Sequence, residues 1–173
     1  GSLVDLNRAG VPLIEIVSEP DLRSAEEVEK YLRKLKSILE YIEVSDCKMQ
    51  EGSLRADVNL SLRPVGTEKF GTRTETKNLN SFRAIARCIE FEIQRQKDIL
   101  DDGGEIFQET RKWDNEKGES FTLRTKENSE DYRYFPDPDL LAVNIGDDVI
   151  KKIKETMPLL PNDLKKLYVE DYG

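Results

Sequence analysis

The sequence has no histidine and only two cysteines, Cys47 and Cys88, which do not form a CxxC pair. Histidine and paired cysteines are the usual ligands of structural zinc, and histidine is the general base of Ser-His and Cys-His nucleophile systems. Zinc sites and nucleophile systems of these kinds are therefore excluded within these 173 residues. We expect both thiols to be packing residues.

A long apolar segment is also lacking. No run approaches the roughly 20 residues that cross a bilayer, and the first residues do not resemble a secretory signal. With 36% charged and 37% hydrophobic residues the chain is polar, yet its apolar residues are regularly spaced, as in folded proteins. We expect a folded protein that is not bound to a membrane, in the cytoplasm or, in a eukaryote, in an organelle matrix.

Positive charge is in the minority. The 27 basic residues are outnumbered by 35 acidic ones, and the net charge is -8. A domain that binds nucleic acid mainly through the phosphate backbone carries a net positive charge instead. If RNA is a substrate, most of the residues that hold it lie outside this chain.

The periodicity of apolar residues predicts an α+β fold. Two helices of about 20 residues alternate with short hairpins, a pattern typical of a largely antiparallel sheet that the two helices cover on one face. Ser24 is the predicted N-cap of the first helix, and Asn80 or Ser81 that of the second. The predicted elements are a strand at 11–17, a helix at 24–43, strands at 54–63 and 69–77, a helix at 81–101, strands at 105–113 and 120–126, and a helix at 147–157. A last helix is predicted to follow the linker and cap MPLLPND at 157–163.

The hairpin of 54–63 and 69–77 places an unusual set of charges on one face. A five-residue loop would pair residues whose numbers add to 132, so that Asp57 faces Glu75, directly or as a diagonal neighbour. By the same rule, Arg55 faces Lys77 and Asn59 faces Arg73. Like charges across a pair of strands repel one another, which makes this face costly unless a ligand relieves the repulsion.

Two interpretations of this face remain open. It is typical of a solvated sheet face, which needs no ligand. Alternatively, a divalent cation lies between Asp57 and Glu75, while Arg55, Lys77 and Arg73 hold phosphate oxygens. Magnesium prefers one or two carboxylates together with phosphate oxygens and water, and this set matches that preference. In the second interpretation Glu15, a carboxylate inside an apolar strand, is a third acid on the same face.

Other motifs for nucleotide chemistry are missing. The sequence has no P-loop, and no glycine fingerprint follows a strand, so an ATP site would be of a less common kind. The proline- and aspartate-rich segment 131–138 is predicted to be irregular. Its charged residues and the one that follows are as easily turn formers as site residues: Asp131, Arg133, Asp137 and Asp139.

Five segments carry a resemblance to a known family. In order they are SLVDLNRAGVPLIEIVSEPD, EGSLRADVNLSLRP, FGTRTETKNLNSF, IFQETRKW and DYRYFPDPDL. In sequence and spacing they resemble the central part of the B subunit of the glutamyl/aspartyl-tRNA amidotransferases. The resemblance covers nearly the whole chain, and several long motifs in order are far more specific than one short pattern.

The resemblance implies a function. In that family the B subunit uses ATP and Mg²⁺ to phosphorylate the side-chain carboxylate of misacylated Glu-tRNA(Gln) or Asp-tRNA(Asn). The A subunit is an amidase that releases ammonia from glutamine, and this ammonia then displaces the phosphate, in a complex that also contains a small C subunit. The implied partners are therefore the A and C subunits and the acceptor end of the misacylated tRNA. A noncatalytic module that docks subunits and tRNA in the same complex is the rival interpretation.

The resemblance also implies roles for particular residues and a domain boundary. Residues 1–157 correspond to the cradle-shaped catalytic domain, and residues 158–173 to the start of a helical domain. Two further motifs of the family, an N-terminal Glu-x-His segment and a later acidic motif, do not occur here, and we expect this chain alone to fold but not to amidate. The resemblance implies metal binding and catalysis for Asp57 and Glu75 and a catalytic role for Glu15. The charge pattern of the hairpin adds Lys77 as a catalytic candidate and Arg55, Asn59 and Arg73 as cofactor-binding candidates.

Overall fold

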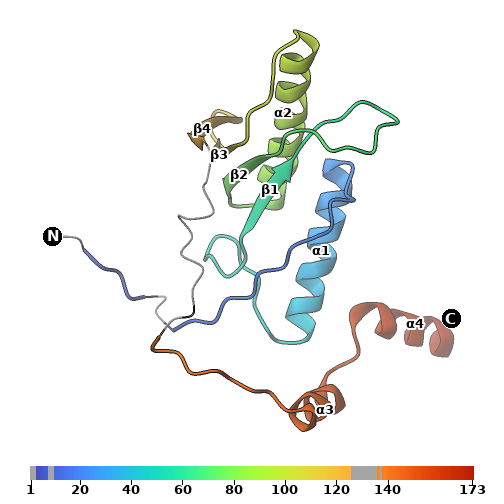
Figure 1. Cartoon of the computed structure of the whole chain (residues 1–173). Coiled ribbons are helices and arrows are strands. Elements are labelled where there is room, and N and C mark those ends of the chain that lie inside the picture. The colour runs from blue at the N-terminus through green and yellow to red at the C-terminus, as the bar shows by residue number, and fades with distance from the viewer. Residues whose placement is uncertain (1–2, 8–9, 126–135, 137) are drawn as a thin grey trace.

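The structure, a computed structural model, describes residues 3–7, 10–125, 136 and 138–173. It is an α+β fold with one four-stranded, mostly antiparallel sheet (Figure 1). The elements in chain order are α1 (Ala25–Tyr41), β1 (Ala56–Leu60), β2 (Thr74–Leu79), α2 (Phe82–Asp101), β3 (Glu109–Asp114), β4 (Glu119–Thr125), α3 (Asp147–Thr156) and α4 (Pro161–Tyr172).

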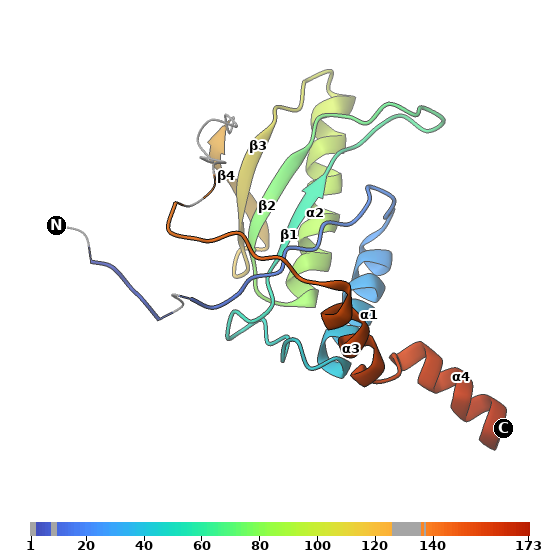
Figure 2. The same cartoon turned by 60° about the horizontal axis from the view of Figure 1, so that its bottom comes forward.

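The strands lie side by side in their sequence order, β1-β2-β3-β4, and Figure 2 shows them with β4 on the left. β1 pairs with β2 and β3 with β4, both antiparallel. β2 and β3 pair in parallel because the chain returns through α2 between them. The sheet therefore consists of two antiparallel pairs joined along one parallel seam, which we call the β2–β3 seam.

The predicted register of the first hairpin was wrong by two residues. Asn59 lies opposite Glu75, not Arg73, because the chain leaves the sheet after Leu60 instead of running on to residue 63. The backbone N–H of Leu62 donates to Gln96 Oε1 on α2 at 3.1 Å, so it bonds to the helix and not to β2. Residues 61–73 therefore form a longer loop. At its base a Cβ on Gly71 would collide with the carbonyl oxygen of Leu62.

The two long helices begin where the sequence predicts. Ser24 Oγ accepts from the backbone N–H of Glu27 at 3.1 Å, and Ser81 Oγ accepts from that of Ala84 at 3.0 Å. These bonds satisfy amide groups that the first turn of a helix leaves without an intrahelical partner. Side-chain capping, readable from the sequence, sets both helix starts.

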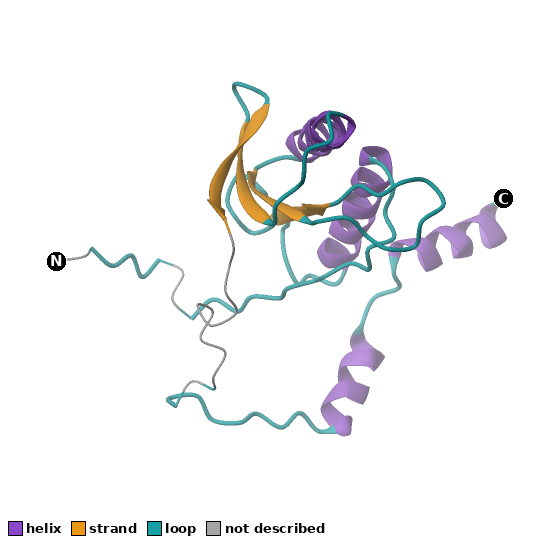
Figure 3. Cartoon of the chain, turned by 45° about the horizontal axis from the view of Figure 1, so that its top comes forward, coloured by secondary structure: helices purple, strands orange, loops and turns teal. Residues whose placement is uncertain are grey.

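The core lies between α2 and the sheet. Its buried residues include Ile85 and Ile89 of α2, Leu79 of β2 and Trp113 of β3. α2 contacts all four strands, reaching β3 through the ring contact of Phe91 with Trp113, whereas α1 packs chiefly against α2 and adds Leu32 to the core. Figure 3 shows the two long helices on one side of the strands. Of these two helices, both expected to cover the sheet, α2 does so directly and α1 mainly through α2.

Residues 11–17, predicted as a buried strand, are not one in the structure. The segment is extended but belongs to no strand, and its apolar side chains are exposed, with Leu13 at 89% and Val17 at 82%. A strand needs a neighbour to accept its backbone hydrogen bonds. Among the described residues none pairs with this segment. Its apolar side chains therefore have no neighbouring strand in that part of the chain to bury them, and they remain exposed.

The second hairpin and the C-terminal helices agree with the prediction. β3 and β4 are joined by a turn in which Gly118 N–H donates to the Asp114 carbonyl at 2.9 Å. α3 and α4 lie near the positions expected from the sequence, away from the sheet (Figure 1). In the part of the chain that is described, no helix is both long and apolar enough to span a bilayer. The candidates Asp131, Arg133 and Asp137 lie outside the described residues, and Asp139 is exposed in a turn.

Candidate functional site

The sheet face turned away from α2 carries a lysine between two carboxylates. Lys77 Nζ donates to Asp57 Oδ2 at 2.9 Å and lies 3.0 Å from Glu75 Oε1. The side chains of Lys77, Asp57 and Glu75 are 34%, 46% and 24% exposed, so solvent and ligands reach them. We call these three residues the ion cluster and this side of the sheet the open face.

The ion cluster corrects one part of the predicted charge pattern. Asp57 does not face Glu75 directly, because Asn59 takes that position; the two carboxylates are diagonal neighbours on one face. Lys77 lies beside Asp57 instead of opposite Arg55, so the expected repulsion between two cations is replaced by an ion pair. The prediction that Asp57 is a diagonal neighbour of Glu75 is confirmed. The prediction that the two residues pair directly was wrong, because the register is shifted by two residues.

The other predicted site residues lie at varying positions around the cluster. Asn59 is exposed on β1, directly across from Glu75. Arg55 and Arg73 are exposed at the residues that immediately precede β1 and β2. Glu15 belongs to the exposed extended segment and not to the sheet. The structure thus brings four of the predicted residues together on the open face and leaves Glu15 outside the sheet.

Nearby charges and burial shift the pKa of Lys77 in opposite directions. Partial burial is the largest single influence and disfavours its charge, but hydrogen bonds to Asp57 and Glu75 and the charges of both carboxylates outweigh it. The pKa of Lys77 is therefore raised above its ordinary value. The ammonium stays charged throughout the physiological range.

Two carboxylates around one cation fit a divalent ion in number and kind. Magnesium takes one or two protein carboxylates and fills its remaining positions with water and phosphate oxygens. Asp57 and Glu75 already share one cationic group. Among the described residues no group of three or more metal-ligating side chains occurs, so a metal bound here would take its other ligands from water, a substrate or residues outside this set.

Glu75 is also tied to the neighbouring strand. Thr110 Oγ1 of β3 donates to Glu75 Oε2 at 3.1 Å, and the two residues are register partners across the β2–β3 seam. Sequence reasoning missed Thr110. Alternation within a strand shows which face a residue takes but not which strands are neighbours, and a parallel pair separated by a helix leaves no turn signal.

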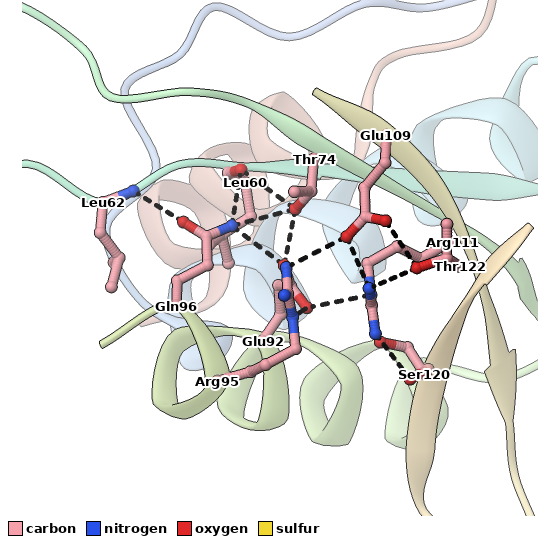
Figure 4. A network of polar contacts seen from close by, with 10 residues as sticks. All are labelled: Leu60, Leu62, Thr74, Glu92, Arg95, Gln96, Glu109, Arg111, Ser120 and Thr122. Carbon is pink, nitrogen blue, oxygen red and sulfur yellow. Dashed lines mark hydrogen bonds and ion pairs between the residues drawn. The ribbon is translucent and has the colours of Figure 1, made fainter. Parts of the chain in front are cut away.

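Beneath the open face, on the side of α2, lies a buried polar network (Figure 4). Glu92 of α2 is 1% exposed and accepts from Thr74 Oγ1 at 2.7 Å and from Arg95 Nη2 at 2.6 Å. Gln96, fully buried, donates to Thr74 Oγ1 at 3.0 Å and accepts from the backbone of Leu62. These bonds join α2 to the end of β1 and the start of β2.

The same network continues across the seam into the second hairpin. Arg111 of β3 donates to Glu109 Oε1 at 2.6 Å and to Ser120 Oγ of β4 at 2.8 Å. Its Nε also lies 3.6 Å from Glu92 Oε2. Glu92 therefore contacts side chains of both β2 and β3 (Figure 4). The network connects the two strands of the seam on the side of α2, and the Glu75–Thr110 bond connects them on the open face.

Glu92 is ionised despite its burial. Burial, the largest influence, raises the pKa of its carboxyl, but the hydrogen bonds from Arg95, Gln96 and Thr74 and the charge of Arg95 together hold that pKa below its ordinary value. The sequence did contain a signal for this network. Helical spacing puts Glu92 and Gln96 on the same face as Ile89, so two polar residues continue an apolar stripe.

Comparison with known proteins gives the family. Residues 1–151 match the GatB/GatE catalytic domain. The chain belongs to the GatB/GatE catalytic domain family. It is 61% identical over all of its 173 residues to the aspartyl/glutamyl-tRNA(Asn/Gln) amidotransferase B subunit of Caldicellulosiruptor bescii, and covers 36% of that protein.

Other members of this family are similarly close. The amidotransferase B subunits of Thermoanaerobacter sp. (strain X514) and Lachnoclostridium phytofermentans are 57% and 60% identical to the chain, over 100% and 99% of its length. The chain again covers 36% of each. It thus spans about a third of the curated relatives that it matches. The family match extends over all strands of the sheet, including the ion cluster, while the boundary expected at residue 157 stays a prediction.

Proposed function

We propose that this chain is the central part of the catalytic domain of the B subunit of a tRNA-dependent amidotransferase. The complete B subunit would use ATP and Mg²⁺ to phosphorylate the side-chain carboxylate of Glu-tRNA(Gln) or Asp-tRNA(Asn). Ammonia that the A subunit, an amidase, releases from glutamine would then replace the phosphate, in a complex with a small C subunit. The proposal is supported by the family and by the names of relatives at about 60% identity.

The observation that carries the proposal is the ion cluster on the open face. A carboxylate substrate is a poor electrophile, and phosphorylation gives it a good leaving group. Such transfer depends chiefly on positioning and on neutralising negative charge. Asp57 and Glu75 supply two oxygens to a cation, and Lys77 supplies a positive charge within 3.0 Å of both carboxylates.

The proposed roles follow from these contacts. Asp57 and Glu75 would hold Mg²⁺, which when bound neutralises phosphate charge. Lys77, released from its carboxylate partners by the metal, would pair with a phosphate oxygen. Asn59 lies across from Glu75 and offers an amide on the same face, and the exposed guanidinium groups of Arg55 and Arg73 at the strand starts would bind ATP phosphates. Glu15 is the least supported of the predicted catalytic residues, because it lies outside the sheet.

The test separates catalysis from assembly. In the intact complex, Asp57→Ala and Glu75→Ala should each lower ATP-dependent amidation by about 10²-fold or more, because misplacing a reacting group has effects of that size. Glutaminase activity of the amidase partner should be partly retained. Glu90→Ala, at an exposed position of α2, is the matched control and should leave amidation unchanged.

The same experiment distinguishes the rival, a noncatalytic docking module. If the chain only docks subunits and tRNA, both cluster variants will amidate at a near-normal rate as long as the complex assembles. Assembly is measured separately by size-exclusion chromatography with light scattering. Near-normal amidation by both cluster variants would therefore refute the catalytic role.

A further inference from the structure

The alternation of side chains along β2 breaks near its end. Glu75 and Lys77 lie on the open face, while Thr74 and Thr76 are buried on the side of α2. In a regular strand, residues two apart share a face, so Leu79 should follow Lys77 onto the open face. Leu79 is instead 4% exposed and belongs to the core. The strand therefore changes phase between Lys77 and Leu79.

A β-bulge produces this change of phase. Val58 is paired with Thr76 and Ala56 with Leu79, so that Asp57 alone lies opposite the two residues Lys77 and Asn78. Asn78 has φ of 69°, in the left-handed region. Among residues other than glycine, asparagine is one of the few that enter this region readily. Bulges of this kind redirect side chains and occur often beside functional sites.

The side chain of Asn78 extends the seam beyond its backbone pairing. The parallel register of β2 and β3 ends with Lys77 opposite Lys112, so the next pair in sequence would be Asn78 and Trp113. Asn78 Nδ2 donates to the Trp113 carbonyl oxygen at 3.0 Å. A side-chain amide thus continues the contact between the strands where the backbone has turned away.

We propose that Asn78 is a positioning residue: its left-handed backbone creates the bulge that holds Lys77 between Asp57 and Glu75 while Leu79 stays in the core. Without the extra residue, a regular register would place either Lys77 in the core or Leu79 on the open face. The inference concerns the geometry of the ion cluster, and only its catalytic consequence rests on the proposed function. The bulge is part of the site because Asp57 is the residue opposite it.

The first measurement follows Lys77 itself and does not depend on catalysis. In the 173-residue chain, the position of the Lys77 side chain between Asp57 and Glu75 is followed by NMR, from its side-chain chemical shifts and its NOEs to those two residues, in wild type, Asn78→Gly, Asn78→Ala and Asn78→Val. Glycine adopts positive φ freely, whereas alanine is strained there and valine more so. Asn78→Gly should keep the NOEs between Lys77 and both carboxylate side chains, and Asn78→Ala and Asn78→Val should weaken or lose them.

Controls separate positioning from a loss of stability. The side-chain signal of Lys112, the register neighbour of Lys77 on β3, should move little in all variants. Ile85→Val shortens a buried core side chain on α2 without changing the sequence of β2, and it should leave the Lys77 NOEs as in wild type. If Asn78→Val does not fold, Asn78→Ala carries the comparison. An unchanged Lys77 in Asn78→Ala, or an equal loss in Asn78→Gly, would overturn the backbone role.

The second measurement is amidation by the intact complex. Asn78→Gly should stay within about threefold of wild-type kcat, and Asn78→Ala should lose about tenfold or more, with little change in KM for tRNA. Loss of the Lys77 contacts with Asp57 and Glu75 in Asn78→Ala together with normal amidation would support the positioning inference and refute the catalytic role of the cluster. The failure of one proposal is thereby distinguished from that of the other.

Discussion

Lys77 Nζ lies 2.9 Å from Asp57 Oδ2, and its other carboxylate partner, Glu75, is the diagonal neighbour of Asp57. The ammonium therefore occupies the position that a metal shared by these carboxylates would take. If Asp57 and Glu75 hold Mg²⁺ as proposed, the metal must displace this ammonium, and the two cations compete for the same oxygens.

This competition predicts that Lys77→Met raises the affinity of the chain for Mg²⁺. Removing the internal cation leaves two carboxylates uncompensated, and at a partly exposed site we expect an increase of about tenfold. Affinity is measured by isothermal titration calorimetry. Lys69→Met, in the exposed loop of residues 61–73, is the control and should bind as wild type does. An unchanged or weakened affinity in Lys77→Met would show that the carboxylates do not hold the metal.

The buried network predicts a large loss of stability in Glu92→Gln. The substitution keeps the shape of the side chain but removes the charge that Arg95 and Arg111 face in the interior. Breaking a buried ion pair by removing one partner costs about 3–5 kcal/mol of free energy of unfolding. Denaturant unfolding of wild type and variant gives the difference. Glu90→Gln, two residues away and exposed, should change stability by less than about 0.5 kcal/mol.

The ionisation of Glu92 predicts a pH dependence with a defined sign. Its folded-state pKa is lowered, so its charge contributes stability that is present above the unfolded pKa of about 4.3 and is lost as pH falls through the lower folded value. The gap in unfolding free energy between wild type and Glu92→Gln should be constant from about pH 6 to 7 and shrink below about pH 4.3. A gap that stays constant in acid would contradict an ionised Glu92.

The two cysteines should be unreactive in the folded protein. Cys47 is 1% exposed and Cys88 fully buried, which confirms them as interior residues. Burial, the main cause, raises the pKa of the Cys88 thiol to about 11, and the thiolate is the reactive form. A colorimetric thiol reagent at about pH 8 should modify neither cysteine in native buffer and both in denaturant. Rapid modification of Cys88 in native buffer would show that the α2–sheet interface opens.

Local features of the fold were predictable because they depend on neighbours in the chain. Ser24 and Ser81 cap the helices through bonds to amides three residues on. The faces of β1 follow from strict alternation, with Val58 toward the core and Asp57 away from it. The register of the first hairpin could not be predicted in this way because it depends on loop length: residues 61–73 separate β1 from β2, where we expected a five-residue loop.

The sequence by itself determined which segments fold as helices, which strands form hairpins, and that Asp57, Glu75 and Lys77 share one face, since each depends on spacing along the chain. Only the tertiary structure decided that the two hairpins join along β2 and β3. The parallel seam brought Thr110 to Glu75 and Arg111 to Glu92 across a helix of 20 residues, and a buried carboxylate is stable only where such distant donors meet it. Residues 11–17 show the same limit, because an apolar pattern specifies a strand only when a neighbouring strand is present to pair with it.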